Sequence, residues 1–174
     1  MDMLCLIRFV PLAHDRLIMW EAVEHYAAAA ANMQGQQIHR KGSQLMTLFK
    51  SPNDALTLLS ETLDAGETEG FAISAGLAQG IQSRATLASS LAGFTEGTME
   101  TLLELTSAAT LQEVAISGKL SSIIKLAAPA YWDRFEAIRP PANLRLRSLF
   151  VMTPQSHPDA HLRPLPVREC VSGA

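Results

Sequence analysis

The sequence predicts a single α+β domain in which helices pack on one face of an antiparallel β-sheet. Short apolar segments typical of strands alternate along the chain with segments whose apolar residues recur at the helical period. Two pairs of strands are adjacent in sequence, one around Gly42 and Ser43 and one around Pro140 and Pro141. Such pairs indicate antiparallel hairpins, which exclude a simple doubly wound parallel sheet.

The composition is typical of one globular domain. The chain has 174 residues, 48% hydrophobic and 18% charged, which is enough for a sizeable core. Its net charge of −3 gives no reason to expect nucleic acid or an acidic membrane surface as a partner. We find no apolar run long enough to span a membrane and no signal peptide. Because Cys5 and Cys170 do not form a disulfide framework, we expect a cytoplasmic protein.

The first half of the chain has the clearest pattern. Strands are predicted over residues 3–10, Gln36–Lys41, Gln44–Phe49 and 71–75, and helices over residues 17–31 and from Pro52 to the glycines at 66 and 70. Gly42 occupies the first central position of a tight turn, where glycine is favoured. Ser51 is expected to cap the second helix, with Pro52 at its first position, where a missing N–H costs nothing.

The second half begins with a stretch of small and polar residues, 78–90, which we expect to be a mobile loop. A helix capped by Thr95 or Thr98 then extends to Ala109. The remaining predicted elements are a strand at Glu113–Ser117, a helix over 120–126, and a closing antiparallel pair over 131–138 and 144–152. We therefore predict one domain over residues 1–153 and an extended, flexible tail over residues 154–174.

Residues 38–49 carry the most informative pattern in the chain. Their sequence, IHRKGSQLMTLF, resembles the central hairpin of the class III nucleotide cyclases, in which Lys-x-x-Gly-Asp precedes an apolar strand ending in Phe. Gly42 and the strand ending at Phe49 match that pattern. Ser43, however, stands where the family places a metal-binding aspartate.

Three further segments resemble the same family in the same order. Within residues 100–117 the matching positions are Leu105, Ala109, Val114, Ile116 and Ser117. Residues 51–55 are similar to the helix start after the hairpin, and residues 146–154 to the final strand. The resemblance implies a ferredoxin-like sheet with helices packed on it. It also implies domains that pair head to tail, with the ligand crevice between the two protomers.

The resemblance also implies that the metal ligands have been lost. Active members use one aspartate on the first strand and one in the hairpin to hold two metal ions around the triphosphate. The matching positions here are Pro11 and Ser43, and a serine hydroxyl is a weak substitute for a carboxylate. Asp15 is close in sequence but is expected to have entered the helix. We therefore expect no metal and no cofactor.

The family's partner-side residues are also replaced. An asparagine and an arginine on the third major helix orient the ribose and stabilise the transition state, and the matching positions are Glu100 and Glu104. A carboxylate facing a polyphosphate repels it by roughly 1–4 kcal/mol at contact range. His39 replaces the lysine that reads the base in adenylyl members. No catalytic residue can be assigned, and cyclase activity is not expected.

The basic run His39, Arg40 and Lys41 lies beside the hairpin turn and is a candidate contact for an anion or another ligand. Alternation along a strand would place His39 and Lys41 on the face opposite Arg40. A solvated strand face is therefore the interpretation that we favour.

Together these patterns predict a catalytically inactive, cyclase-like domain with a regulatory or scaffolding role. We expect a homodimer, or a heterodimer with a cyclase-like partner, and a small-molecule ligand other than a nucleoside triphosphate. An enzyme of unrelated chemistry is an alternative; it would need the side chains of His25, His39, Glu100 and Glu104 to meet in one crevice. A residual nucleotide cyclase is another, and would need Asp15 to face a second carboxylate across the hairpin.

Overall fold

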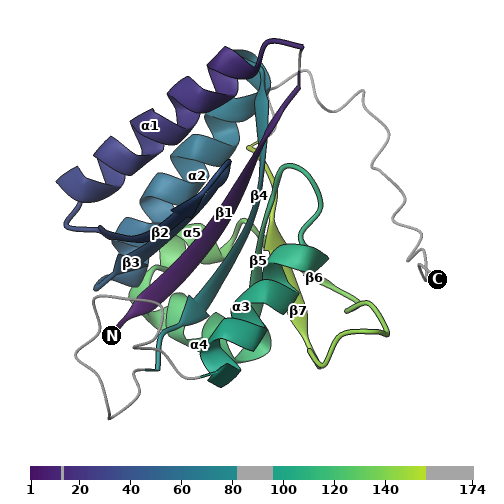
Figure 1. The fold of residues 1–174 in the computed structure, drawn as a ribbon. Coiled ribbons are helices and arrows are strands. Elements are labelled where there is room, and N and C mark those ends of the chain that lie inside the picture. The colour runs from purple at the N-terminus through teal and green to yellow at the C-terminus, as the bar shows by residue number, and fades with distance from the viewer. Residues whose placement is uncertain (13, 82–95, 156–174) are drawn as a thin grey trace.

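The computed structural model of the chain describes residues 1–12, 14–81 and 96–155. In this part of the chain, strands in the order β2-β3-β1-β4-β5-β7-β6 form one sheet (Figure 1). The strands are β1 (Met3–Pro11), β2 (Gln36–Lys41), β3 (Gln44–Phe49), β4 (Phe71–Gln79), β5 (Glu113–Ser117), β6 (Phe135–Ile138) and β7 (Leu149–Met152). The helices are α1 (Arg16–Asn32), α2 (Pro52–Glu69), α3 (Glu96–Ala108), α4 (Gly118–Ala127) and α5 (Pro129–Trp132).

The predicted ferredoxin-like arrangement is confirmed in the first half of the chain. The elements β1-α1-β2-β3-α2-β4 give the strand order β2-β3-β1-β4, with every neighbouring pair antiparallel. The second half extends the sheet beyond β4. There β5 pairs with β4 in parallel, and β7 and β6 follow as an antiparallel pair.

The two faces of the sheet carry separate hydrophobic cores, because successive residues of β1 point to opposite sides. Met3, Cys5, Ile7 and Phe9 belong to the core under α1, α2 and α4, whereas Leu4 and Leu6 belong to the core under α3. Figure 1 shows α3 on the side of the sheet opposite α1 and α2. The prediction of helices on one face therefore holds for α1, α2 and α4 but is wrong for α3.

Local signals at the hairpin and at α2 are confirmed. Gly42 adopts a φ of +57°, which glycine tolerates without a steric cost, and it joins β2 to β3 in the predicted turn. The Ser51 side chain accepts a hydrogen bond from the Asp54 N–H at 3.4 Å, and Pro52 opens α2. Gly70 ends the helix with a φ of +90°, whereas Gly66 lies inside α2, packed against the Phe71 carbonyl.

Several helix and strand boundaries differ from those predicted from the sequence. Strand β4 continues through Gly76 to Gln79, because the missing side chain of Gly76 leaves room for α3 to cross it. Helix α3 begins at Glu96, so Thr98 lies inside it and accepts a hydrogen bond from the Ile81 N–H at 3.2 Å. Residues 129–132 are helical, which shortens the predicted closing strand pair to β6 and β7. Most of the predicted loop, Thr95 and the tail beyond residue 155 lie outside the described residues.

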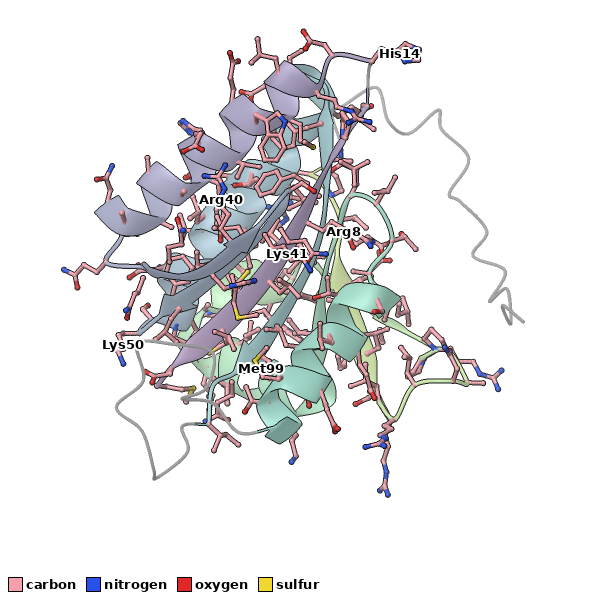
Figure 2. The ribbon with its side chains drawn as sticks, in the orientation of Figure 1. Arg8, His14, Arg40, Lys41, Lys50 and Met99 are labelled. Carbon is pink, nitrogen blue, oxygen red and sulfur yellow. The ribbon has the colours of Figure 1, made fainter. Side chains whose placement is uncertain are left out.

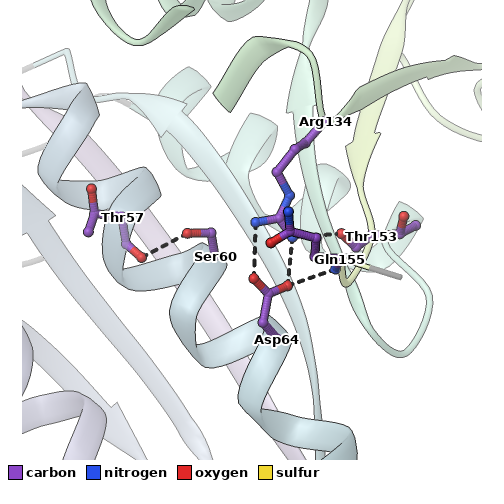
Figure 3. Close-up of polar contacts among 6 residues, drawn as sticks. All are labelled: Thr57, Ser60, Asp64, Arg134, Thr153 and Gln155. Atoms are coloured by element: carbon purple, nitrogen blue, oxygen red, sulfur yellow. Dashed lines mark hydrogen bonds and ion pairs between the residues drawn. The ribbon is translucent and has the colours of Figure 1, made fainter. Parts of the chain in front are cut away.

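A half-buried ion pair fixes the end of the described chain against α2 (Figure 3). Both guanidinium nitrogens of Arg134 donate to the Asp64 carboxylate, at 3.1 and 2.6 Å. The same guanidinium donates to the Thr153 carbonyl, and Asp64 also accepts from the Gln155 N–H at 2.8 Å. The bidentate Arg134–Asp64 pair therefore holds residues 153–155 through one hydrogen bond to each partner. No helix within the described ranges is long and apolar enough to cross a membrane.

Candidate functional site

The fold brings the Pro11 and Ser43 positions to one pocket of about 330 Å³. Its walls come from the end of β1, the β2–β3 turn and the first turns of α1. The lining residues are Arg8, Phe9, Val10, Pro11, Arg16, Met19, Trp20, Gly42 and Ser43. The two positions that the resemblance paired are thus on one hollow, although 31 other residues separate them in the sequence.

Backbone hydrogen bonds hold this pocket in shape. The Phe9 N–H donates to the Ser43 carbonyl at 3.0 Å, which ties the hairpin turn to β1. The Leu12 N–H donates to the Gly70 carbonyl at 3.0 Å, which fixes the end of β1 beside the end of α2. These two backbone contacts tie the hairpin turn and the end of α2 to β1 on the side of the pocket.

The lining does not fit a divalent metal ion. Magnesium and calcium need oxygen ligands, chiefly carboxylates, and none of the residues that line the pocket is acidic. Asp15, which caps α1, accepts a hydrogen bond from the Leu17 N–H at 2.9 Å instead. Asp15 was expected to lie inside the helix, but it is the residue immediately before the first helical residue, Arg16. Over the described residues, no group of three or more His, Cys, Asp or Glu side chains is arranged to hold a metal.

The lining residues are instead mostly apolar, with Arg8 and Arg16 as the charged ones, and Arg8 follows the alternation of β1 toward the α3 face. Phe9 and Met19 are buried, while Trp20 remains 38% exposed. On the α1 face the hollow is therefore chiefly an aromatic and aliphatic surface. Such a lining does not offer a hydrated cation the oxygen ligands that it needs.

The basic run next to the turn is divided between the two faces of the sheet. Arg40 faces α1, where its guanidinium pairs with the Glu24 carboxylate at 2.5 Å and lies 5.9 Å from the Trp20 ring centroid. Lys41 lies on the other face, where it and Arg8 both pair in register with Gln44. Figure 2 shows Arg40 beside α1 and the other two near the hairpin turn. An anion contact by His39, Arg40 and Lys41 together stays a prediction.

Glu100 and Glu104 project from α3 toward the loop before β7. The Glu100 carboxylate accepts from the Arg145 guanidinium at 3.3 Å, and the Glu104 carboxylate accepts from the Arg145 N–H at 3.2 Å. Both contacts are solvent-exposed, so they contribute little stability. The two contacts hold the Glu100 and Glu104 carboxylates on the exposed surface of α3.

No family model matches this sequence, and no curated protein matches it by sequence. Its backbone nevertheless matches solved structures over almost its whole length. The guanylate cyclase domain of RhGC from Catenaria anguillulae, in complex with GTP, superposes with a TM-score of 0.59 at 12% identity, covering 89% of this chain and 97% of that one. The chain has the fold of a class III nucleotide cyclase domain.

Two other structures support the same assignment. The adenylyl cyclase CyaB from P. aeruginosa matches with a TM-score of 0.56 at 12% identity, over 91% of this chain and 95% of that one. A dimeric guanylyl cyclase domain of the RhoGC fusion protein from the fungus Blastocladiella emersonii matches with a TM-score of 0.58 at 12% identity, over 89% and 95%. The predicted resemblance to class III cyclase domains and the predicted fold class are confirmed.

The cyclase fold separates the residues that an unrelated enzyme would have to bring together. His25 is on α1 and lines a hollow between α1 and α2. Glu100 and Glu104 are on α3, on the other side of the sheet. The predicted alternative of a shared crevice for His25, His39, Glu100 and Glu104 is therefore not supported.

Two residues of this cyclase-fold pocket were missed from the sequence. Arg8 is the one charged residue within the apolar β1. It pairs in register with Gln44, the first residue of β3 after the hairpin turn. Arg16 is the first residue of α1. A charge interrupting a buried strand was the available signal for Arg8, whereas no pattern in the sequence placed Arg16 at the same pocket.

Proposed function

We propose that this chain is a non-catalytic cyclase-fold domain that regulates or scaffolds through pairing with a second cyclase-fold domain. The observation that carries this proposal is the pocket at Pro11 and Ser43, whose lining residues include no carboxylate. Cyclisation in the resembled family needs metal ions that bridge the phosphates and activate a hydroxyl. A pocket without a carboxylate among its lining residues offers such ions none of the oxygen ligands that they prefer.

The α3 surface supports the same conclusion. In the resembled family this helix supplies the asparagine and arginine that act in the partner's site, and here Glu100 and Glu104 hold those positions. Their carboxylates would repel a triphosphate bound to a second protomer. Both halves of a shared site are therefore unsuited to a metal-bound nucleoside triphosphate.

Pairing is supported by the fold and by the exposed surface of α3. The matched Blastocladiella domain is dimeric, and Leu103, between Glu100 and Glu104 on α3, is 54% exposed. An exposed leucine on a helix that faces the partner in the resembled family is suited to an interface.

Sedimentation velocity of the whole chain tests the pairing. We expect a reversible dimer that Leu103→Glu converts to monomer, because a charge at an apolar contact is costly to bury. Leu126→Glu on α4 is the matched control, because Leu126 is 87% exposed and α4 lies on the side of the sheet opposite α3. The Leu126→Glu variant should therefore still form the dimer. A monomer at all concentrations, both alone and mixed with an intact cyclase domain, would contradict the proposal.

A further inference from the structure

We propose that the hollow between α1 and α2 is the docking site of a C-terminal segment of the same chain, residues 162–168. The sequence of this segment, LRPLPVR, contains two arginines and no acidic residue. The inference goes beyond the proposed function. It does not depend on pairing, because the hollow and the segment belong to one chain.

One face of each helix forms this hollow, where α1 and α2 lie side by side (Figure 1). Its volume is about 190 Å³, and Tyr26, Leu58 and Phe71 are buried beneath it. The lining positions recur every three or four residues on each helix, which is the spacing of a single helix face. Those that reach the surface include Ala22, His25 and Ala29 on α1 and Glu61, Ala65 and Glu69 on α2.

The hollow carries negative charge that no contact within the described residues neutralises. Glu61 and Glu69 are exposed, and neither carboxylate has an ion pair or a hydrogen bond there. Helix α2 contains no lysine or arginine, and the basic residues of α1 are Arg16, at its first position, and His25. A guanidinium group is suited to such a site, because its planar donors match the two oxygens of a carboxylate.

The described chain ends beside the same helix. The Gln155 N–H donates to the Asp64 carboxylate at 2.8 Å, and Arg134 holds that carboxylate from the other side (Figure 3). On a helix with 3.6 residues per turn, Glu61 lies on the surface between Asp64 and Ala65. The chain that follows Gln155 therefore starts next to the α2 wall of the hollow.

The length of the following sequence is sufficient to reach both carboxylates. Arg163 is eight residues beyond Gln155, and an extended chain of that length spans up to about 26 Å. A helix with its side chains is only about 10–12 Å across. Pro164 and Pro166 restrict the backbone to extended conformations, so the segment loses less conformational entropy on docking than a flexible one. Leu165, between the two prolines, is suited to the alanine surface of the hollow.

Paramagnetic relaxation measured by NMR on the whole chain tests the docking. A nitroxide attached to Cys170, two residues after Arg168, reports the position of the segment, whereas Cys5 is buried and stays unlabelled. We expect the nitroxide to broaden the amide signals of the hollow, such as those of Ala29 and Ala65, so that they lose most of their intensity. The amide signals of α3, on the opposite face of the sheet, should keep theirs.

A charge exchange tests whether the arginines hold the segment. Arg163→Glu together with Arg168→Glu should release it and restore the signals of the hollow, because carboxylates would then face carboxylates. Adding Glu61→Arg and Glu69→Arg to the same chain should bring the broadening back, because the two charges are then exchanged.

Arg139→Glu together with Arg147→Glu is the matched control, because both arginines are exposed between β6 and β7 and their replacement makes the same change in net charge. The broadening should persist in this variant. A mixture of the spin-labelled chain with an isotope-labelled Cys170→Ser chain shows whether the segment docks on a second copy instead.

Three results would overturn the proposal. The hollow signals could be as sharp as those of α3, the Arg163→Glu and Arg168→Glu chain could match its control, or the broadening could arise only between molecules in the mixture. The sedimentation experiment is read independently of all three, so failure of the docking and failure of pairing can be distinguished.

Discussion

Gly76→Val is expected to destabilise the domain by about 1–3 kcal/mol, and to loosen α3 from the sheet. A Cβ atom at this position would lie 2.7 Å from the Thr106 Oγ1 and 3.0 Å from the Leu105 Cβ. The Thr106 N would also be 3.0 Å away, and a backbone atom cannot move without shifting the helix. Urea unfolding followed by circular dichroism would measure the loss.

Gly97→Ala on the same helix is the control for this substitution. Among the described residues outside its own turn of helix, no atom lies within 4 Å of a Cβ added at Gly97, and alanine favours the helical conformation more than glycine does. Its stability should therefore equal or slightly exceed that of the parent chain. Equal stability of the Gly76→Val variant and the parent chain would contradict the close packing of α3 on β4.

The stability of the domain is expected to fall steeply above pH 9, because the Cys5 thiol is buried in the core. Burial raises the pKa of this thiol from 9.0 to about 12, while hydrogen bonds with Tyr26 and Thr47 act in the opposite direction. Below pH 9 both folded and unfolded chains keep the proton. Between pH 9 and 12 the unfolded chain loses the proton and the folded chain keeps it, so unfolding is favoured.

The expected loss is on the order of a few kcal/mol between pH 9 and 12. Urea unfolding below and above this pH would measure it, in a Cys170→Ser background that removes the second thiol. Cys5→Ala should flatten the slope between pH 9 and 10. Tyr26→Phe should leave most of that part unchanged, because the pKa of a tyrosine in the unfolded chain is about 10.0, so Tyr26 contributes mainly above that pH. The same slope in the Cys5→Ala variant and its parent would contradict this account.

The sequence was most informative where structure depends on neighbours in the chain. The hairpin at Gly42 and the cap at Ser51 follow from glycine's tolerance of positive φ and from a serine oxygen that accepts a helix N–H. Both were predicted at the correct residue. The C-terminal end of β4 and the start of α3 were not, because they depend on packing at Gly76 and on the contact between Ile81 and Thr98.

Features that depend on distant segments could not be predicted. The period of apolar residues identifies the buried face of α3 but not the side of the sheet on which it packs. The core polar contacts of Tyr26, whose hydroxyl lies 3.3 Å from the Thr47 Oγ1 and 3.9 Å from the Cys5 Sγ, join three separate elements. Likewise, the resemblance located Pro11 and Ser43, but the arginines beside them became visible only when β1, the turn and α1 were assembled.

The central claim is that the position of the cyclase metal site cannot hold metal ions here. Thermal unfolding of the whole chain with ATP or GTP, each in manganese and in EDTA, tests it most directly. We expect the same melting temperature with either nucleotide whether manganese or EDTA is present. A nucleotide that stabilised the chain only with manganese, by about 2.7 kcal/mol at 100 times its dissociation constant, would show a working metal site and contradict the claim.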